Sequence, residues 1–340
     1  MKRNKHLILV IGPAHSGTSV LTKGLETMGV SLGPSLTLSS PFEQKLHWED
    51  PDVHTLNFEM ILSFGKERRR EILPLSCNEV ETLVAKGFLE RASQLLLGKF
   101  PKHQPLGIKD PRFSILFPFW ERVFQHNQIT LSLIIALRHP GSTTATQAEH
   151  VEKSSWIWIS YLLASLDAAT IHQSLIVDYD TLLSDPAYQM RRIARILGLS
   201  IVEEDLRLYC QYYVDLKRRH FYETKMRSTS LPFYRKLAFE IYEELRKVAT
   251  DELDLQDLRE PLLSWKKALQ EISSLLVLAE KKHARIKAQR EEIQQLDQTI
   301  HQLHKESNQQ TYAIAHYSKE IHRREVRLHA LLQQKRELAE

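Results

Sequence analysis

The chain has 340 residues, of which 42% are hydrophobic and 26% charged, with a net charge of +4. This is enough apolar material for one large domain, or for a domain with an appendage. The two cysteines, Cys77 and Cys210, exclude a disulfide framework or a cysteine metal site, and no apolar run is long enough to span a membrane.

Glycine, proline and charge all divide the chain near the same position. The last glycine is Gly198 and the last proline is Pro261, so residues 262–340 contain neither. That stretch holds 14 Lys+Arg against 10 Asp+Glu, which accounts for the whole net charge. We predict an α/β domain over 1–262 and a helical tail over 263–340. The positive charge of the tail is mild and dispersed, so we expect no nucleic-acid partner.

The N-terminal segment predicts a strand, a loop and a helix. "HLILVIG" (6–12) is a short apolar run typical of a buried strand, and "GTSVLTKGLETMGV" (17–30) has helical spacing. Together they form the first half of a parallel βαβ unit. The first apolar run is shorter than that of a signal peptide and leads straight into the loop, so we expect a cytoplasmic protein.

Strands and helices alternate further along the chain. Strands are predicted at 129–137 and 174–179, and helices at 79–98, 154–171, 186–198 and 233–249. This alternation predicts an α/β fold in which helices flank a parallel, P-loop-like sheet. A ligand site should then lie beyond the carboxyl ends of the strands.

The tail carries a heptad repeat of apolar residues. The a and d positions are mostly apolar over 286–303 and again over 314–331, with a polar interruption at Ser307 and Gln310. We predict a C-terminal α-helical coiled coil. It forms either between chains, as a parallel homodimer, or within one chain, as a hairpin bent near Ser307. A helix lying against its own domain is the remaining alternative.

The loop after the first strand has the glycine spacing of a phosphate-binding loop but not its lysine. Gly12 and Gly17 fit G-x-x-x-x-G-K-[ST], yet Thr18 and Ser19 follow. A glycine turn that opens a helix directs backbone N–H groups at one point, and the hydroxyl of Ser16 can add a donor. Without the lysine, and with no evident acidic magnesium ligand ending a later strand, the loop suits a monophosphate better than γ-phosphoryl transfer.

A second candidate anion contact follows the strand at 129–137. "ALRHP" (136–140) puts Arg138 and His139 where this strand ends, at the edge of the sheet that carries the glycine loop. An arginine at this edge is well placed to pair with a second phosphate.

Five motifs occur in a fixed order over the first 200 residues. They are "GPAHSGTSVL" (12–21), "IKDPRFSILFPFW" (108–120), "LRHP" (137–140), "WISY" (158–161) and "VDYDTLLSDP" (177–186). Together they resemble the ordered motifs of the sulfotransferase family, in the bacterial branch that sulfates carbohydrates. The resemblance spans roughly residues 7–200, and the order of the motifs makes it more specific than any one of them.

The resemblance implies a donor, 3′-phosphoadenosine 5′-phosphosulfate (PAPS), that needs neither a Walker lysine nor a metal. Arg138 would bind its 3′-phosphate together with Thr146, where the family usually has serine. The loop that would bind its 5′-phosphosulfate consists of Gly12, Pro13, Ala14, His15, Ser16, Gly17, Thr18 and Ser19.

The resemblance also implies catalytic candidates. The family usually has lysine or arginine at the position of His15, where the charge neutralises the bridging oxygen as the sulfuryl group leaves. A histidine is charged there only if the bound anion raises its pKa from about 6.5, and Lys109 is the other source of charge. In "KLHWEDPDVHTLN" (45–57), Glu49 is the first candidate for the acceptor base and His47 the second. The alternative interpretation of "WEDPD" is a helix cap with solvated acidic residues.

Four further residues of the motifs are expected to be structural. Asp110 and Arg112 would form an ion pair that shapes their loop, and Tyr179 and Asp180 would end a strand and cap a helix. The sequence thus predicts a metal-independent sulfotransferase acting on a hydroxyl of a carbohydrate or glycolipid. The rival hypotheses are a P-loop small-molecule kinase, and a scaffold in which a degenerate domain carries the coiled coil.

Overall fold

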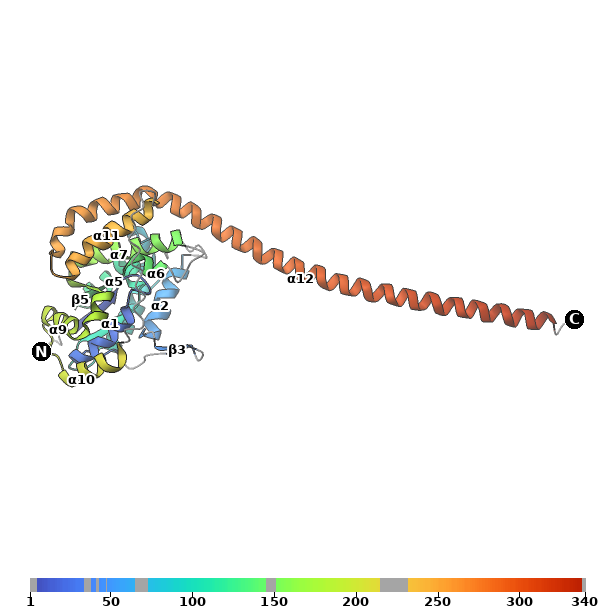
Figure 1. Cartoon of the computed structure of the whole chain (residues 1–340), viewed down its shortest axis with the longest axis horizontal. Coiled ribbons are helices and arrows are strands. Elements are labelled where there is room, and N and C mark those ends of the chain that lie inside the picture. Colours follow the sequence, from blue (N-terminus) through green and yellow to red (C-terminus); the bar gives the residue numbers. More distant parts are fainter. Residues whose placement is uncertain are drawn as a thin grey trace. The chain divides into compact units, whose positions relative to one another are not determined.

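The computed structural model describes residues 5–33, 38–40, 43–46, 48–64, 73–144, 151–214 and 232–337. The chain divides into two compact units, Met1–Leu278 and Ala279–Glu340. The first contains the sheet and its flanking helices, and the second is helical (Figure 1).

The core of the first unit is a four-stranded parallel sheet in the order β4-β1-β5-β6. Its strands are β4 (Leu106–Lys109), β1 (Lys5–Ile11), β5 (Ile129–Leu137) and β6 (Gln173–Asp178). Val10 pairs with Lys109, and Ile11 pairs with Ile135, so β4, β1 and β5 end close together at one edge. The predictions of β1, β5, β6 and a parallel α/β sheet are confirmed, whereas β4 was not predicted.

Helices and short turns connect these strands. The bounds are α1 Thr18–Gly24, η1 Leu25–Met28, α2 Pro51–Leu62, α3 Cys77–Ala85, α4 Phe88–Lys99, α5 Phe113–His126, α6 Pro140–Thr144, α7 Val151–Ala169, α8 Tyr179–Ser184, α9 Pro186–Leu197, α10 Glu203–Leu208, η4 Tyr209–Tyr213, α11 Phe233–Ala249, η6 Leu255–Leu258 and α12 Arg259–Glu337. A separate hairpin pairs β2 (Leu38–Ser40) with β3 (Glu43–Leu46).

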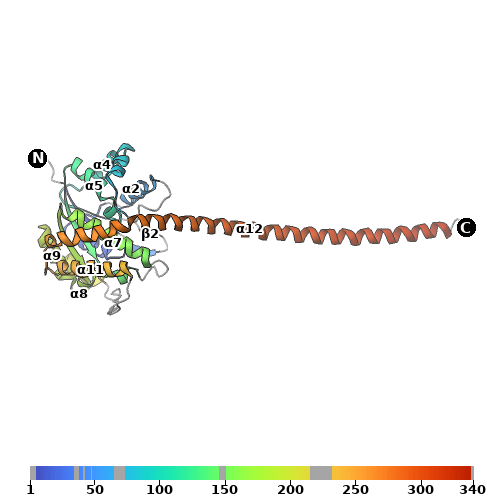
Figure 2. The same ribbon diagram turned by 90° about the horizontal axis from the view of Figure 1, so that it is seen from above.

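Successive residues of the central strand face two different apolar layers. Leu7 and Leu9 belong to the larger layer, which includes α5, α7 and α11, whereas Ile8 and Val10 belong to a smaller layer with α1 and α9. Figures 1 and 2 show α7 and α11 side by side in the larger layer. Because both faces are covered, β1 is apolar and buried from Leu7 to Ile11, as expected of a buried parallel strand.

Most predicted helices are confirmed, and one is divided. Helices α7, α9 and α11 match the predicted segments within a few residues. The helix predicted over 79–98 is instead α3 followed by α4, because Gly87 between them has a φ of 78°. A left-handed residue ends one helix and lets the next begin in a new direction.

Helix α12 is continuous from Arg259 to Glu337. Its first turns bury Trp265 in the larger apolar layer, so the predicted division at residue 262 falls inside this helix. The helix runs unbroken through Ser307, so the hairpin alternative is wrong for this structure. The described side chains from 282 to 319 are exposed. A helix lying against its own domain stays an alternative prediction. The coiled coil between chains stays a prediction.

None of the helices among the described residues combines the length and apolarity needed to cross a membrane.

Candidate functional site

The turn between β1 and α1 requires its two glycines. Positive φ angles occur at Gly12 (127°), His15 (63°) and Gly17 (88°). A Cβ on Gly12 would lie 2.6 Å from the carbonyl oxygen of Ala136, and one on Gly17 would lie 2.2 Å from the Tyr179 ring. The turn therefore packs tightly on β5 and on the residue after β6. Gly17 opens helix α1, whose first N–H groups have no partner within the helix.

Polar side chains behind the turn hold part of it in place. The Gly12 N–H donates to Ser114 Oγ at 3.2 Å, and the Ser165 hydroxyl donates to the same oxygen at 3.0 Å. Within the turn, the Ser16 N–H donates to the Pro13 carbonyl at 3.3 Å. The Ser16 hydroxyl is buried and has no hydrogen-bond partner among the described residues. Such an orphaned hydroxyl typically costs about 1–3 kcal/mol, so the turn is incomplete by itself.

Arg138 lies directly beside the glycine turn. Its Nη1 donates to the His15 carbonyl at 2.9 Å, and its guanidinium carbon lies 4.4 Å from the centre of the Tyr179 ring. The Trp158 indole N–H donates to the Arg138 carbonyl at 3.2 Å. Side chain and backbone are thus both fixed, and the expected closeness of Arg138 to the turn is confirmed. One hydrogen bond uses only one of the five guanidinium N–H donors.

His139 packs against helix α11. Its Nδ1 accepts the Gly141 N–H at 3.1 Å, and its ring packs against Phe239 and Tyr242 with centroids 5.0 Å apart in both cases. Burial lowers the pKa of His139, so the ring is neutral near pH 7. Its role is structural.

Lys109 and Glu49 meet at the end of β4. Lys109 Nζ donates to Glu49 Oε1 at 2.6 Å, with the side chains 3% and 20% exposed respectively. The other Glu49 oxygen lies 3.8 Å from His54 Nε2. Because Lys109 pairs with Val10, two residues before Gly12, this ion pair is adjacent to the start of the turn. The structure therefore brings the candidate cation and the first candidate base together.

Asp50, and not Glu49, caps the following helix. Its Oδ1 accepts the N–H groups of Asp52 and Val53, both at 3.1 Å, and its Oδ2 lies 2.7 Å from Lys99 Nζ. The helix-cap interpretation of "WEDPD" is therefore right for Asp50. Glu49 does not cap the helix and instead accepts a hydrogen bond from Lys109.

Asp110 is a buried structural carboxylate. Its Oδ2 accepts Asn57 Nδ2 at 3.0 Å, and its Oδ1 accepts the Arg112 N–H at 2.9 Å and lies 3.5 Å from Arg112 Nε. Burial raises the pKa of Asp110. The predicted ion pair is confirmed. Both oxygens of Asp110 are engaged in holding the loop.

Asp178 ends β6 and caps α8, which corrects the expectation that Tyr179 or Asp180 would be the cap. Asp178 Oδ1 accepts the N–H groups of Asp180 at 3.1 Å and Thr181 at 3.0 Å, and the Tyr242 hydroxyl donates to Oδ2 at 3.3 Å. Burial raises the pKa of Asp178 to about 6. Tyr179 instead lies under Arg138 and Gly17, where it shapes the site.

The pKa of Asp178 predicts a loss of stability as the pH rises. The pKa rises from 3.8 to about 6 on folding, so between these values the folded protein binds the proton more tightly than the unfolded chain. The tighter binding of this proton stabilises the folded protein by about 3 kcal/mol. This stabilisation is fully present below about pH 3.8 and is lost as the pH rises through 6. Asp178→Asn stays neutral and should lose this dependence.

Urea unfolding of the wild type and of Asp178→Asn between pH 4 and pH 7.5 measures the effect. The unfolding free energy of the variant relative to the wild type should increase by about 2 kcal/mol over this interval. Asp185→Asn changes the capping carboxylate of α9 and controls for the loss of a cap. A pH-independent difference for Asp178→Asn would contradict the assignment.

The remaining predicted site residues are distributed as follows. In the turn, Pro13 and Thr18 are buried, Ser19 is half-buried, and Ala14 and His15 are exposed. His47 and Thr146 lie outside the described residues, so their predicted roles stay predictions.

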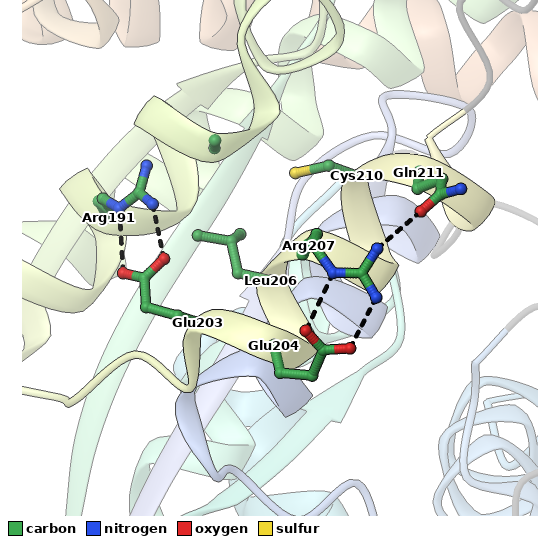
Figure 3. A pocket seen from close by; sticks show the side chains of 8 residues that line it. Arg191, Glu203, Glu204, Leu206, Arg207, Cys210 and Gln211 are labelled. Carbon is green, nitrogen blue, oxygen red and sulfur yellow. Dashed lines mark hydrogen bonds and ion pairs between the residues drawn. The ribbon is translucent and has the colours of Figure 1, made fainter.

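Two cavities lie elsewhere on the first unit. One, of about 620 Å³, is lined by residues of α9, α10 and η4 (Figure 3). Its charges neutralise each other, since Arg191 pairs with Glu203 and Arg207 with Glu204, each at 2.7 Å. The other, of about 610 Å³, lies at the start of β6 and contains the ion pair of the buried Arg192 with the exposed Asp251. Neither is lined by the glycine turn or Arg138.

Among the residues that the structure describes, no group of three or more His, Cys, Asp or Glu side chains could hold a metal ion.

Sequence reasoning missed two residues that build this site. Ser114 anchors the turn and Trp158 anchors Arg138. Tyr179, expected to be structural, supports both Arg138 and Gly17. Each belongs to one of the five motifs, so membership in a motif was the available signal. The structure brings all five motifs to one edge of the sheet.

No family model matches the chain, and no curated protein matches its sequence. Solved structures do match. The sulfotransferase domain of an olefin synthase from Synechococcus is 17% identical over 72% of this chain and 96% of its own, with a TM-score of 0.43. A sulfotransferase from Mycobacterium tuberculosis is 14% identical over 63% and 73%, with a TM-score of 0.37. A retinol dehydratase, solved with androsterone and the inactive cofactor PAP, is 15% identical over 77% and 80%, with a TM-score of 0.33.

Proposed function

We propose that this protein transfers a sulfuryl group from PAPS to a hydroxyl group of an acceptor. The observation that carries the proposal is the 2.9 Å hydrogen bond between Arg138 and the glycine turn. It puts a guanidinium and a set of backbone N–H groups at neighbouring strand ends. Two anionic groups of one nucleotide can then be bound at once, one by each.

The residues of the turn fit a monophosphate. A left-handed residue between two left-handed glycines directs N–H groups towards a common point, as in other anion-binding turns. The orphaned hydroxyl of Ser16 supplies a further donor once an oxygen reaches it. The turn has no lysine after Gly17, and a phosphosulfate does not need one.

The mechanism that we infer is a direct in-line displacement. The acceptor oxygen forms a bond to sulfur while the bond between sulfur and the bridging oxygen of the donor breaks. The electron pair of that bond stays on adenosine 3′,5′-bisphosphate, and the acceptor proton passes to Glu49. Lys109, next to Glu49 and to the turn, supplies positive charge as negative charge develops on the bridging oxygen. His15 adds to this charge only when protonated.

For the acceptor we propose a carbohydrate or glycolipid hydroxyl. The support for it is the resemblance of the five motifs to carbohydrate sulfotransferases.

Mass spectrometry of acceptors incubated with the protein and PAPS tests the activity. A panel of cell-envelope glycans, glycolipids and simple phenols and sterols should show the added sulfuryl mass on a glycan or glycolipid. Sulfation of only phenols or sterols would contradict the acceptor class. Formation of no sulfated product, with magnesium-dependent turnover of ATP, would contradict the reaction and favour the kinase.

A further inference from the structure

The second unit exposes a long apolar row on helix α12. Ten large apolar side chains at heptad a and d positions between Ile286 and Leu331 are 48% to 67% exposed. Isolated exposed apolar side chains are common, but a regular row along one helix marks a surface that binds another helix. Lys282 and Lys335 hold the next d and a positions beyond the row, so the row ends there.

The charges beside the row disfavour a parallel pair of helices. In a parallel dimer, each g position faces the following e position of the other chain. Three such pairs would join like charges, and none in this segment would join opposite charges. They are Arg285 with Arg290, Glu292 with Asp297 and Glu320 with Glu325. Arg324, at a d position, would also face its own counterpart inside the seam.

An antiparallel pair removes these conflicts. When two copies are centred between Ser307 and Gln310, a positions face d positions. Leu303 then faces Ile314, Leu296 faces Ile321, and Ile286 faces Leu331 of the second copy. Ser307 faces Gln310 twice, once on each side of the two-fold axis, so the polar interruptions of both chains meet in two adjacent layers at the centre. Arg324 faces Ile293 in place of another arginine.

The flanking charges also become complementary in this arrangement. Antiparallel helices bring g positions opposite g positions, and e positions opposite e positions. Glu292 then faces Arg327, and Arg290 faces Glu325. Each pair occurs twice because the dimer has a two-fold axis. The exposed apolar row and this charge pattern are independent features of the helix, and both favour the same register.

We propose that helix α12 binds a second copy of this chain in antiparallel orientation along Ile286–Leu331, centred between Ser307 and Gln310. This orientation differs from the parallel homodimer predicted from the heptad repeat alone.

Sedimentation equilibrium of full-length charge variants tests the orientation. Glu292→Arg and Arg327→Glu should each raise the dimer dissociation constant about tenfold, and the double variant should restore it to within about threefold. In a parallel dimer, Glu292→Arg would tighten association, because it would then face Asp297. Glu306→Arg makes the same change at a g position that faces Ala313, and should have no effect.

Disulfide trapping gives an independent readout. In a Cys77→Ser/Cys210→Ser background, a Leu296→Cys chain mixed with an Ile321→Cys chain should form a mixed disulfide under mild oxidation. Disulfides only between identical chains, or a strict monomer for the wild type at high concentration, would overturn the proposal. Circular dichroism of each variant establishes that α12 remains helical.

Discussion

Replacing Arg138 with alanine should raise the dissociation constant for adenosine 3′,5′-bisphosphate about 100-fold. The affinity for adenosine 5′-monophosphate should change by no more than about threefold. The physical reason is that a guanidinium forms strong, charge-assisted hydrogen bonds with a phosphate. Only the bisphosphate carries the 3′-phosphate that we assign to Arg138, and the glycine turn serves both nucleotides.

The competing interpretation is that Arg138 only stabilises the turn, since it donates to the His15 carbonyl. Calorimetry with the two nucleotides separates these roles, because damage to the turn would weaken both equally. An equal loss for both would therefore contradict the assignment. Arg122→Ala removes an exposed arginine that pairs with Glu81 at 2.8 Å, and controls for the loss of one positive charge. Unchanged binding of both nucleotides to Arg138→Ala would support the scaffold hypothesis.

Replacing Glu49 with glutamine should lower kcat for sulfuryl transfer about 100-fold or more, while the affinity for adenosine 3′,5′-bisphosphate changes little. The amide keeps an oxygen that can accept from Lys109, so the geometry at the end of β4 is retained and only the capacity to take a proton is lost. Single-turnover rates measured with saturating PAPS report this step directly.

Two outcomes would contradict this role for Glu49. An unchanged rate would place the base elsewhere, with His47 the next candidate. A parallel fall in rate, nucleotide affinity and thermal stability would indicate that Glu49 only compensates the charge of Lys109, which is 3% exposed. The matched control is Glu59→Gln on helix α2, which breaks an exposed ion pair with Arg91.

The long buried strands and amphipathic helices were predictable because each is set by a local pattern. Strands β1, β5 and β6 each contain a short, mostly apolar run, and α11 has a regular helical repeat. Strand β4 was missed because it has only four residues, includes Gly107 and lies between Pro105 and Pro111. Its place in the sheet comes from pairing with β1, which is distant in sequence. The break between α3 and α4 at Gly87 was missed because a hydrophobic repeat does not reveal the φ angle of a single residue.

In the candidate site, too, only the features set by a local sequence pattern were predictable. The glycine spacing and the arginine after β5 were readable from the sequence, and the structure places them together. The ion pair of Lys109 with Glu49 joins residues 60 positions apart, and no local pattern encodes that contact. Nor could the sequence reveal that Tyr179 lies under Arg138, because this depends on the order of the strands.

In the C-terminal tail, the heptad repeat predicts the secondary structure but not the orientation in which two helices pair. The heptad pattern predicted a helix, and the structure has one from Arg259 to Glu337. The apolar positions alone do not distinguish parallel from antiparallel pairing, because a and d residues make a seam in both. Orientation follows from the charged positions beside the seam.

Calorimetry of the wild-type protein with adenosine 3′,5′-bisphosphate and with adenosine 5′-monophosphate, in the absence of magnesium, tests the central claim most directly. If the glycine turn and Arg138 bind two anionic groups of one nucleotide, the bisphosphate should bind about 100-fold more tightly than the monophosphate. Binding of the bisphosphate no tighter than that of the monophosphate would contradict the claim.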